Sequence, residues 1–272
     1  MEVALHQTAS HSWRMWFSQA TWLLVIITAA WLFHLYALVL PTSAVVLVWL
    51  IVSWLIARGL FRRRRIKRKA WLEASLYEHA SLHKRLRGGP FLYSCYLAIG
   101  SFLSAGLLAT LPHLNQSPDW ALLSVGSVVL LMTHAFATRQ LRLQVKPPFL
   151  HEAAWWLSIL FTLTALIIAY MALALHSAQP DFLTSESGFL AAIQYMVDNV
   201  SARSELFQYV LQCYAALDGA RWWTGQTLEN LLSASAIPTL LSWTVIFFQQ
   251  AFFILGWLLM LTGFFTKDIR YE

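Results

Sequence analysis

Six long apolar stretches, separated by polar segments, dominate the pattern of this 272-residue chain. Each approaches the length of about 20 mostly apolar residues that an α-helix needs to cross a bilayer. Because a backbone inside the hydrocarbon must satisfy its own hydrogen bonds, we expect these stretches to be helices. They are predicted as one hairpin over residues 21–60, a second hairpin over 91–138, and single helices over 153–175 and 239–265.

The composition changes this picture from a set of apolar segments to a membrane protein. Hydrophobic residues make up 58% of the chain, charged residues make up 12%, and the mean hydropathy is +0.57. Soluble domains are usually about a quarter charged. A disordered chain, a collagen-like fibre and an ordinary soluble enzyme are therefore excluded. The predicted fold class is an all-α membrane protein with six transmembrane helices.

The polar segments divide their charges unequally between the two sides of the membrane. Of the 19 Lys and Arg residues, 17 fall in or next to the connecting segments of one side, and only Arg203 and Arg221 fall on the other side. That other side carries seven of the 13 acidic residues. The basic side consists of residues 1–20, 61–90, 139–152 and 266–272. Because basic segments stay in the cytoplasm, both termini are predicted to be cytoplasmic, in a bacterial cytoplasmic (inner) membrane.

The segment over residues 176–238 is the longest one on the acidic side, and it has helical periodicity. Apolar residues fall on one helical face over 189–200 and again over 204–217. Ser204-Glu205 is typical of a helix start, and Asp218-Gly219 is typical of a helix stop. We therefore expect a periplasmic helical cap that covers the outer end of the bundle or binds a partner.

The strongest local signal is a run of basic residues in the cytoplasmic segment 61–90. It favours either of two interpretations: an anchor that binds anionic lipid headgroups, or a docking surface for an acidic protein or for nucleic acid. Because no aromatic residues interrupt the run, contact with nucleic acid would be non-specific. The run consists of Arg62, Arg63, Arg64, Arg65, Lys67, Arg68 and Lys69.

A few polar residues lie inside the predicted spans, where they are costly and therefore informative. They are interpreted either as hydrogen-bonding groups between helices or as the lining of a pore. These residues are His34, His134, Gln249 and Gln250. The span centres carry no Asp, Glu, Lys or Arg, which argues against a proton-coupled transporter. Small residues from Gly100 to Gly106 indicate close helix packing, within the chain or with another subunit.

Candidate catalytic and metal-binding chemistry is weak. His79 and His83 share a helical face, but Glu78 precedes the first His, whereas the zinc protease pattern has Glu directly after it. Cys95 and Cys213 fit no metal motif and are interpreted as small apolar residues that do not form a disulfide with each other. We find no phosphate-binding loop, nucleophile elbow or carboxylate pair, so no catalytic residue, metal or cofactor is predicted.

An internal repeat is a further hypothesis. Shifting the first span by 134 positions onto the fifth aligns several aromatic and aliphatic residues. The second and last spans share a Trp and a Gly near their cytoplasmic ends, Trp54 and Gly59 in one, Trp257 and Gly263 in the other. Chance similarity between apolar helices and true duplication both remain open interpretations.

Residues 62–146 resemble part of a known family. They contain the basic run, then Ser75-Leu-Tyr-Glu-His-Ala80, and then Pro90 at the start of a hairpin with the short turn Leu111-Pro-His-Leu-Asn-Gln-Ser-Pro-Asp-Trp120. This arrangement is similar to that of hydrophobic inner-membrane proteins of integrating conjugative elements and conjugative plasmids. The resemblance implies an accessory subunit in conjugative DNA transfer, alongside type IV secretion components.

The function expected from the sequence is therefore that of a non-enzymatic scaffold subunit in a bacterial inner-membrane assembly. Its expected partners are membrane lipids and other protein subunits, with self-association open. Two alternatives are a homo-oligomeric channel or pore-forming effector, lined by the polar span residues, and a membrane-embedded lipid-modifying enzyme.

Overall fold

The computed structural model describes residues 2–75, 90–114, 117–176, 188–231 and 236–265, and all regular structure within these ranges is helical. Within these ranges, side chains are described except at 2–17, 63, 65–67, 70, 117, 148, 174–176, 228–231 and 236–249. The elements are α1 (Glu2–Tyr36), α2 (Thr42–Arg63), α3 (Arg65–Ser75), α5 (Pro90–Thr110), the short 3-10 helix η1 (Leu111–His113), α6 (Ser117–Leu141), α7 (Pro147–His176), α8 (Phe189–Asp198), α9 (Glu205–Leu231) and α10 (Ala236–Phe265).

Five of the described helical segments are long and apolar enough to cross a membrane, which confirms a multi-pass, all-helical membrane protein. They are Ser18–Tyr36, Thr42–Arg62, Pro90–His113, Pro118–Leu141 and Phe149–Leu173. Large apolar side chains on these helices, such as Leu24, Phe102 and Phe136, are exposed on the isolated chain. Exposure of such an apolar surface to water is energetically unfavourable, whereas its contact with lipid tails is not.

The bounds of the first and fifth predicted helices differ from the sequence prediction mainly at their N-terminal ends. Helix α1 extends the predicted first span back to Glu2, and α7 begins at Pro147, inside the segment predicted as 139–152. Proline is favoured at the first turn of a helix, because the amide that it lacks has no partner there. Only a few residues therefore connect α6 to α7.

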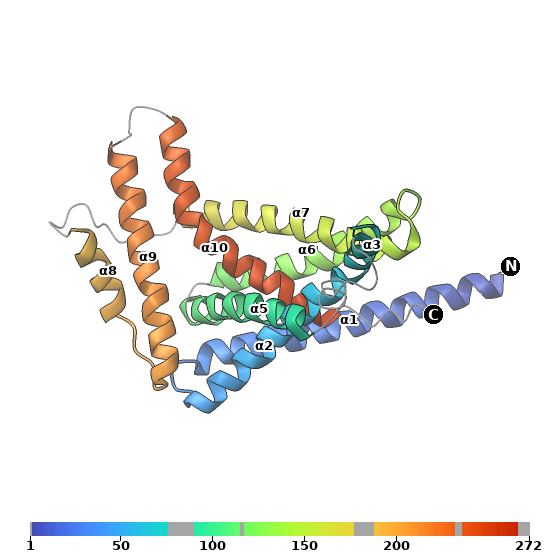
Figure 1. Cartoon of the computed structure of the whole chain (residues 1–272), viewed down its shortest axis with the longest axis horizontal. Coiled ribbons are helices and arrows are strands. Elements are labelled where there is room, and N and C mark those ends of the chain that lie inside the picture. Colours follow the sequence, from blue (N-terminus) through green and yellow to red (C-terminus); the bar gives the residue numbers. More distant parts are fainter. Residues whose placement is uncertain (1, 76–89, 115–116, 177–187, 232–235, 266–272) are drawn as a thin grey trace.

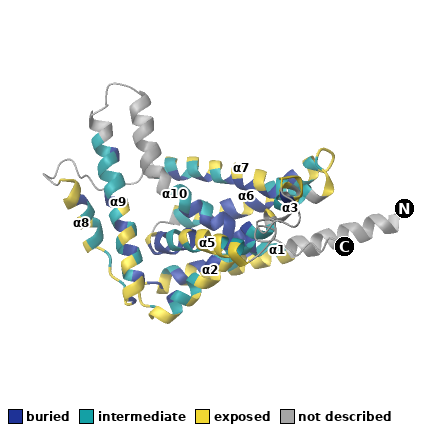
Figure 2. Ribbon diagram, viewed as in Figure 1, coloured by how far each residue is buried: buried dark blue, intermediate teal, exposed yellow. Residues whose placement is uncertain are grey.

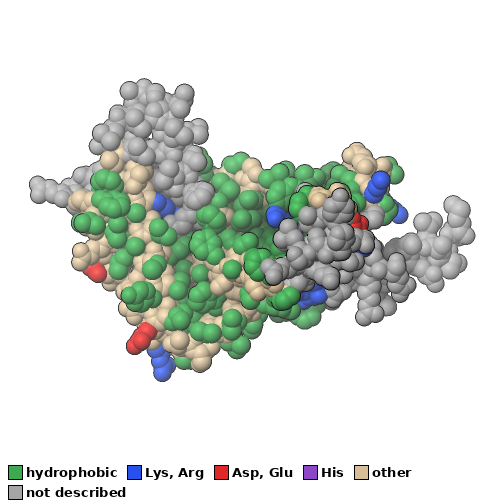
Figure 3. Space-filling view, in the orientation of Figure 1, with side chains coloured by type: hydrophobic (Ala, Val, Ile, Leu, Met, Phe, Trp, Pro, Cys, Tyr) green, Lys and Arg blue, Asp and Glu red, His purple; other side chains and the backbone are tan. Residues whose placement is uncertain are grey.

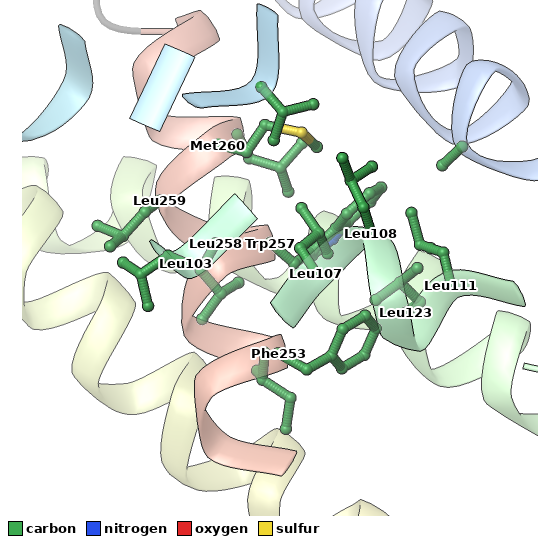
Figure 4. Close-up of a cluster of buried hydrophobic side chains, with 14 of the residues drawn as sticks. Leu103, Leu107, Leu108, Leu111, Leu123, Phe253, Trp257, Leu258, Leu259 and Met260 are labelled. Atoms are coloured by element: carbon green, nitrogen blue, oxygen red, sulfur yellow. The ribbon is translucent and has the colours of Figure 1, made fainter. Parts of the chain in front are cut away.

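Helix α10 lies between two pairs of helices (Figure 1). One pair is α2 with α5, the other is α6 with α7, and α10 contacts α2, α5 and α7. Its second half is almost entirely buried, with Trp257 and Leu258 fully enclosed. Figure 4 shows side chains of α10 meeting leucines of α5 and Leu123 of α6. Dense packing of this kind is the main attraction between helices where lipid replaces water.

Glycines allow three of these helices to approach backbone to backbone. Helices α2 and α10 cross at Gly59 and Gly263, where a Cβ on Gly59 would lie 2.8 Å from the Cα of Gly263. Helices α2 and α5 cross at Gly100, where a Cβ would lie 2.6 Å from the carbonyl oxygen of Ser53. The predicted close packing around Gly100 is confirmed and is made within the chain. Gly106, in contrast, has nothing within 4 Å of a Cβ position.

Hydrogen bonds between helices satisfy the polar groups in this interior. The hydroxyls of Ser53 in α2 and Ser104 in α5 lie 2.7 Å apart. The indole Nε1 of Trp257 in α10 donates to the Ser127 hydroxyl of α6 over 2.9 Å. These bonds join the helices at specific registers, because a buried hydroxyl or indole N–H without a partner is costly.

Helices α8 and α9 form a layer across one end of the bundle (Figure 1). Phe207 and Leu211 of α9 are buried, and Figure 2 shows the exposed outer side of the same helices. Ser204 caps α9 through its hydroxyl, which accepts from the Phe207 amide over 3.3 Å, so the predicted helix start is confirmed. The predicted stop at Asp218-Gly219 is wrong, because α9 continues to Leu231. Gly219 instead allows close approach to the backbone of α8 at Ala192.

Candidate functional site

The end of the bundle opposite the α8–α9 layer is strongly basic, and we call it the basic end. There α1 begins, α2 and α10 end, and α6 connects to α7 (Figure 1). Most Lys and Arg side chains visible in Figure 3 lie there. Its described acidic side chains are Glu73 and Glu152. Its described basic side chains are Arg58, Arg62, Arg64, Arg68, Lys69, Arg139, Arg142 and Lys146.

The predicted basic run forms the junction between α2 and α3. Helix α2 ends at Arg63, and the amide of its C-cap residue Arg64 donates to the Leu60 carbonyl over 3.3 Å. Helix α3 then begins at Arg65 and packs on α7, and its Leu72 is 1% exposed. The basic run is therefore held at the end of the bundle by the packing of α3.

The described side chains of the run have different surroundings. Arg64 and Lys69 are exposed, and Lys69 pairs with Glu73 over 3.8 Å, an exposed ion pair of small energetic value. Arg62 and Arg68 are half-buried. The side chains of Arg63, Arg65 and Lys67 lie outside the described residues.

Aromatic rings accompany the arginines that are partly buried. The guanidinium of Arg68 lies 4.6 Å over the ring of Phe61. Phe61 in turn contacts Tyr93 and Tyr96 of α5, with ring centroids 5.6 and 6.0 Å apart. Arg58 makes a second contact of this kind, with its guanidinium 5.1 Å over the ring of Trp54. This arginine was not among the residues predicted from the sequence. Its position four residues before Arg62, on the same face of α2, was the available signal.

His34 binds the turn between α5 and α6. Its Nδ1 donates to the carbonyl oxygen of Leu111 over 2.9 Å, and its ring packs against Trp120. Trp120 itself donates to the Leu114 carbonyl over 3.0 Å, and the Tyr170 hydroxyl donates to the Asp119 carbonyl over 3.2 Å. These three side chains donate to backbone carbonyls in and next to the turn between α5 and α6, and they join α1 and α7 to it.

His134 lies near the other end, in a group formed by α6 and α7. Its ring centroid is 3.8 Å from that of Trp155 and 5.1 Å from that of His151. The Trp155 indole donates to Nε2 of His151 over 3.0 Å. The sequence alone did not single out His151. The signal that could have paired it with His134 is hairpin geometry, since the two residues lie 10 and 7 positions from Gln144, the middle of the α6–α7 connection.

The structure therefore does not bring the predicted pore residues together. His34 contacts η1 at the end near α9, whereas His134 contacts the first turns of α7. Gln250 is half-buried in α10, and the side chain of Gln249 lies outside the described residues. The pore lining stays a prediction.

Polar contacts also join α9 to the bundle. The Thr110 hydroxyl of α5 donates to the Tyr214 hydroxyl over 2.6 Å.

An ion pair lies within α9, one turn further along the helix. The Oδ1 atom of Asp218 and a terminal guanidinium nitrogen of Arg221 are 2.5 Å apart. Burial raises the pKa of the Asp218 carboxyl above its usual value, while the charges of Arg221 and His113 act in the opposite direction.

Metal chemistry finds no support in the described part of the chain, where no group of three or more His, Cys, Asp or Glu could hold an ion. His79 and His83 lie outside the described residues. Cys95 and Cys213 are exposed free thiols on α5 and α9.

Comparison of the chain with protein-family models, with curated proteins and with solved structures gave no match. The fold defines the class: this is a multi-pass helical membrane protein with one basic end and a helical layer across the other.

Proposed function

We propose that this protein is a non-enzymatic scaffold subunit of a bacterial cytoplasmic-membrane assembly. The observation that carries the proposal is the pair of different surfaces at the two ends of one tightly packed bundle. Basic residues and α3 form one surface, and the α8–α9 layer forms the other. A scaffold needs two such surfaces, each held in a fixed orientation by a rigid core.

The orientation proposed follows from the charges. The basic end faces the cytoplasm, so both termini are cytoplasmic and the α8–α9 layer is periplasmic. Helix α10 makes the sixth crossing, since it is 30 residues long and its described segment Gln250–Phe265 is apolar and packed in the bundle. With six crossings, the ends of the chain return to the same side.

The α8–α9 layer supports a docking role on the periplasmic side. Leu190 of α8 is 76% exposed and Tyr209 of α9 is 73% exposed. Leu217 and Tyr195 are exposed as well. Tyrosine and leucine side chains on rigid helices offer large apolar contact areas at a low entropy cost, which suits a protein partner.

The basic end supports a second contact, with an acidic protein surface. Because its positive charge lies on α3, on the ends of α2 and α6 and on the α6–α7 connection rather than in a base-reading element, contact with nucleic acid would be non-specific. The resemblance of residues 62–146 to membrane proteins of conjugative elements makes the conjugative DNA-transfer machine, with its type IV secretion components, the assembly to test first.

Site-specific photo-cross-linking in cells tests the docking role. A photoreactive amino acid at Leu190 or Tyr209 should give a discrete protein adduct, whereas the same amino acid at Leu47, exposed on the span helix α2, should contact lipid only. Equal yields of protein adducts at all three positions would indicate random collision and would remove the proposal.

The identity of the assembly is tested separately. Deletion of the gene should lower transfer of the conjugative element, and the protein should co-purify with transfer components in mild detergent. Recovery of a free monomer together with unchanged transfer would exclude this assembly.

A further inference from the structure

One face of α2 gathers charge and aromatic rings where the helix approaches the basic end. Trp54, Arg58, Phe61 and Arg62 are spaced at i, i+4, i+7 and i+8, so they lie on the same side of the helix. Arg68 reaches this face from α3, with its guanidinium 4.6 Å over the Phe61 ring. Two helices therefore bring Arg58 and Arg68 to one aromatic surface.

The guanidinium groups of these two arginines are not fully satisfied by the protein. The Nε atom of Arg58 and all three guanidinium nitrogens of Arg68 are buried without a hydrogen-bond partner. A guanidinium has five N–H donors, and burying them without acceptors is costly. The rings of Trp54 and Phe61 offset part of this cost through cation–π contacts but accept no conventional hydrogen bond.

The described side chains supply little negative charge at this end to compensate. The two described carboxylates there are Glu73, which pairs with Lys69, and Glu152 on α7. Against them stand eight described basic side chains. The local balance therefore favours an external anion with several acceptor oxygens.

The surroundings indicate which anion this is. Arginine forks match the geometry of phosphate oxygens. Trp54, in the second half of α2, and Phe91, in the first turn of α5, are exposed apolar residues. A free phosphate would gain nothing from these rings, whereas a phospholipid would pack its glycerol and upper acyl chains on them.

We infer that Arg58 and Arg68, flanked by Trp54 and Phe61, bind the headgroup phosphate of an anionic phospholipid. The site lies within the basic end, but the inference does not depend on the protein-docking role proposed for that end. Bound lipid would satisfy the buried guanidinium groups and hold α3 against α2, so it would stabilise the α2–α3 junction.

The test measures lipid binding to the purified full-length protein. Native mass spectrometry from neutral detergent would count bound lipid after addition of phosphatidylglycerol, of phosphatidylcholine at the same mole fraction, or of inorganic phosphate. Arg58→Gln and Arg68→Gln each remove one guanidinium, and Lys69→Gln is the matched control, because it removes one positive charge from an exposed neighbour.

Phosphatidylglycerol should bind to the unaltered protein in preference to phosphatidylcholine. Loss of a charge-assisted fork should weaken phosphatidylglycerol binding about tenfold or more in Arg58→Gln and Arg68→Gln, and less than about twofold in Lys69→Gln. Should Arg68→Gln not fold, Arg68→Lys keeps the charge but loses the fork, and it should still weaken binding several-fold.

Three results would overturn the inference. Equal weakening by all the substitutions would show a diffuse electrostatic surface instead of a site. Equal binding of phosphatidylcholine would show that the negative headgroup is not recognised. Binding of inorganic phosphate as tightly as phosphatidylglycerol would show that the site binds free phosphate.

Discussion

Replacement of Gly263 by alanine should destabilise the bundle at the crossing of α2 and α10. The added Cβ would overlap the carbonyl oxygen of Leu55 and lie 2.8 Å from its carbonyl carbon, whereas ordinary contact begins at 3.4 Å. Because both obstacles are backbone atoms, the helices must separate by at least the difference between 3.4 Å and 2.8 Å, which is about 0.6 Å. A gap of this size forfeits roughly a quarter of the dispersion energy of the facing atoms, and overpacking costs about 1–3 kcal/mol.

Thermal unfolding of the full-length protein in mild detergent, followed by tryptophan fluorescence, measures this effect. We expect Gly263→Ala to lose about 2 kcal/mol, which lowers the Tm by roughly 4–8 °C for a chain of this size. Gly106→Ala is the matched control, since a Cβ there meets nothing within 4 Å and alanine favours the helix. If both variants unfold at the temperature of the unaltered protein, the crossing described here is wrong.

Three further changes test other parts of the structure by the same thermal assay. Trp257→Phe removes the bond to the Ser127 hydroxyl and should cost about 1–2 kcal/mol, and the loss should not add to that of Ser127→Ala. His34→Phe removes the side-chain donor to the Leu111 carbonyl and should cost about 1–2 kcal/mol, with partial recovery in His34→Asn; an unchanged Tm would argue against the turn contact. Because burial raises the pKa of Asp218, the folded state binds its proton more tightly, so this contribution to stability is greatest in acid and is lost as the pH rises through the raised pKa. Asp218→Asn should therefore flatten the dependence of Tm on pH above the ordinary carboxyl range of about pH 4, and an unaltered profile would contradict the assignment.

Apolar length and periodicity were sufficient to predict the membrane class. Five described spans confirm it, because crossing a bilayer requires about 20 apolar residues whatever the tertiary fold. Periodicity also located α8 and the start of α9. It failed at Asp218-Gly219, where the pattern resembles a helix stop but the glycine serves a contact with α8.

Contacts between helices could not be predicted in the same way. Gly59 and Gly263 were noted as equivalent positions of a possible repeat, but only the packed bundle shows that these two glycines meet each other. Arg58 was overlooked because an arginine at the end of a span usually extends to the interface and needs no partner. Its significance comes from Arg68, which α3 brings to the same aromatic face.

Polar residues in the spans illustrate the limit of reasoning from type alone. A histidine in an apolar segment suggests either a helix contact or a pore. For His34 the structure supplies a partner, the Leu111 carbonyl in a tight turn 77 residues further along the chain. Sequence distance hides such a pairing, since the turn between α5 and α6 must form and fold back before the contact exists.

The central claim is that the basic end and the α8–α9 layer face opposite sides of a membrane. Labelling with a membrane-impermeant maleimide tests it directly, because Cys213 is an exposed thiol on α9. In spheroplasts, Cys213 should react without permeabilisation. With Cys95→Ser in both proteins and Cys213→Ser added in the second, Arg142→Cys at the basic end should react only after the membrane is opened. Reaction of both positions from the same side would contradict the account.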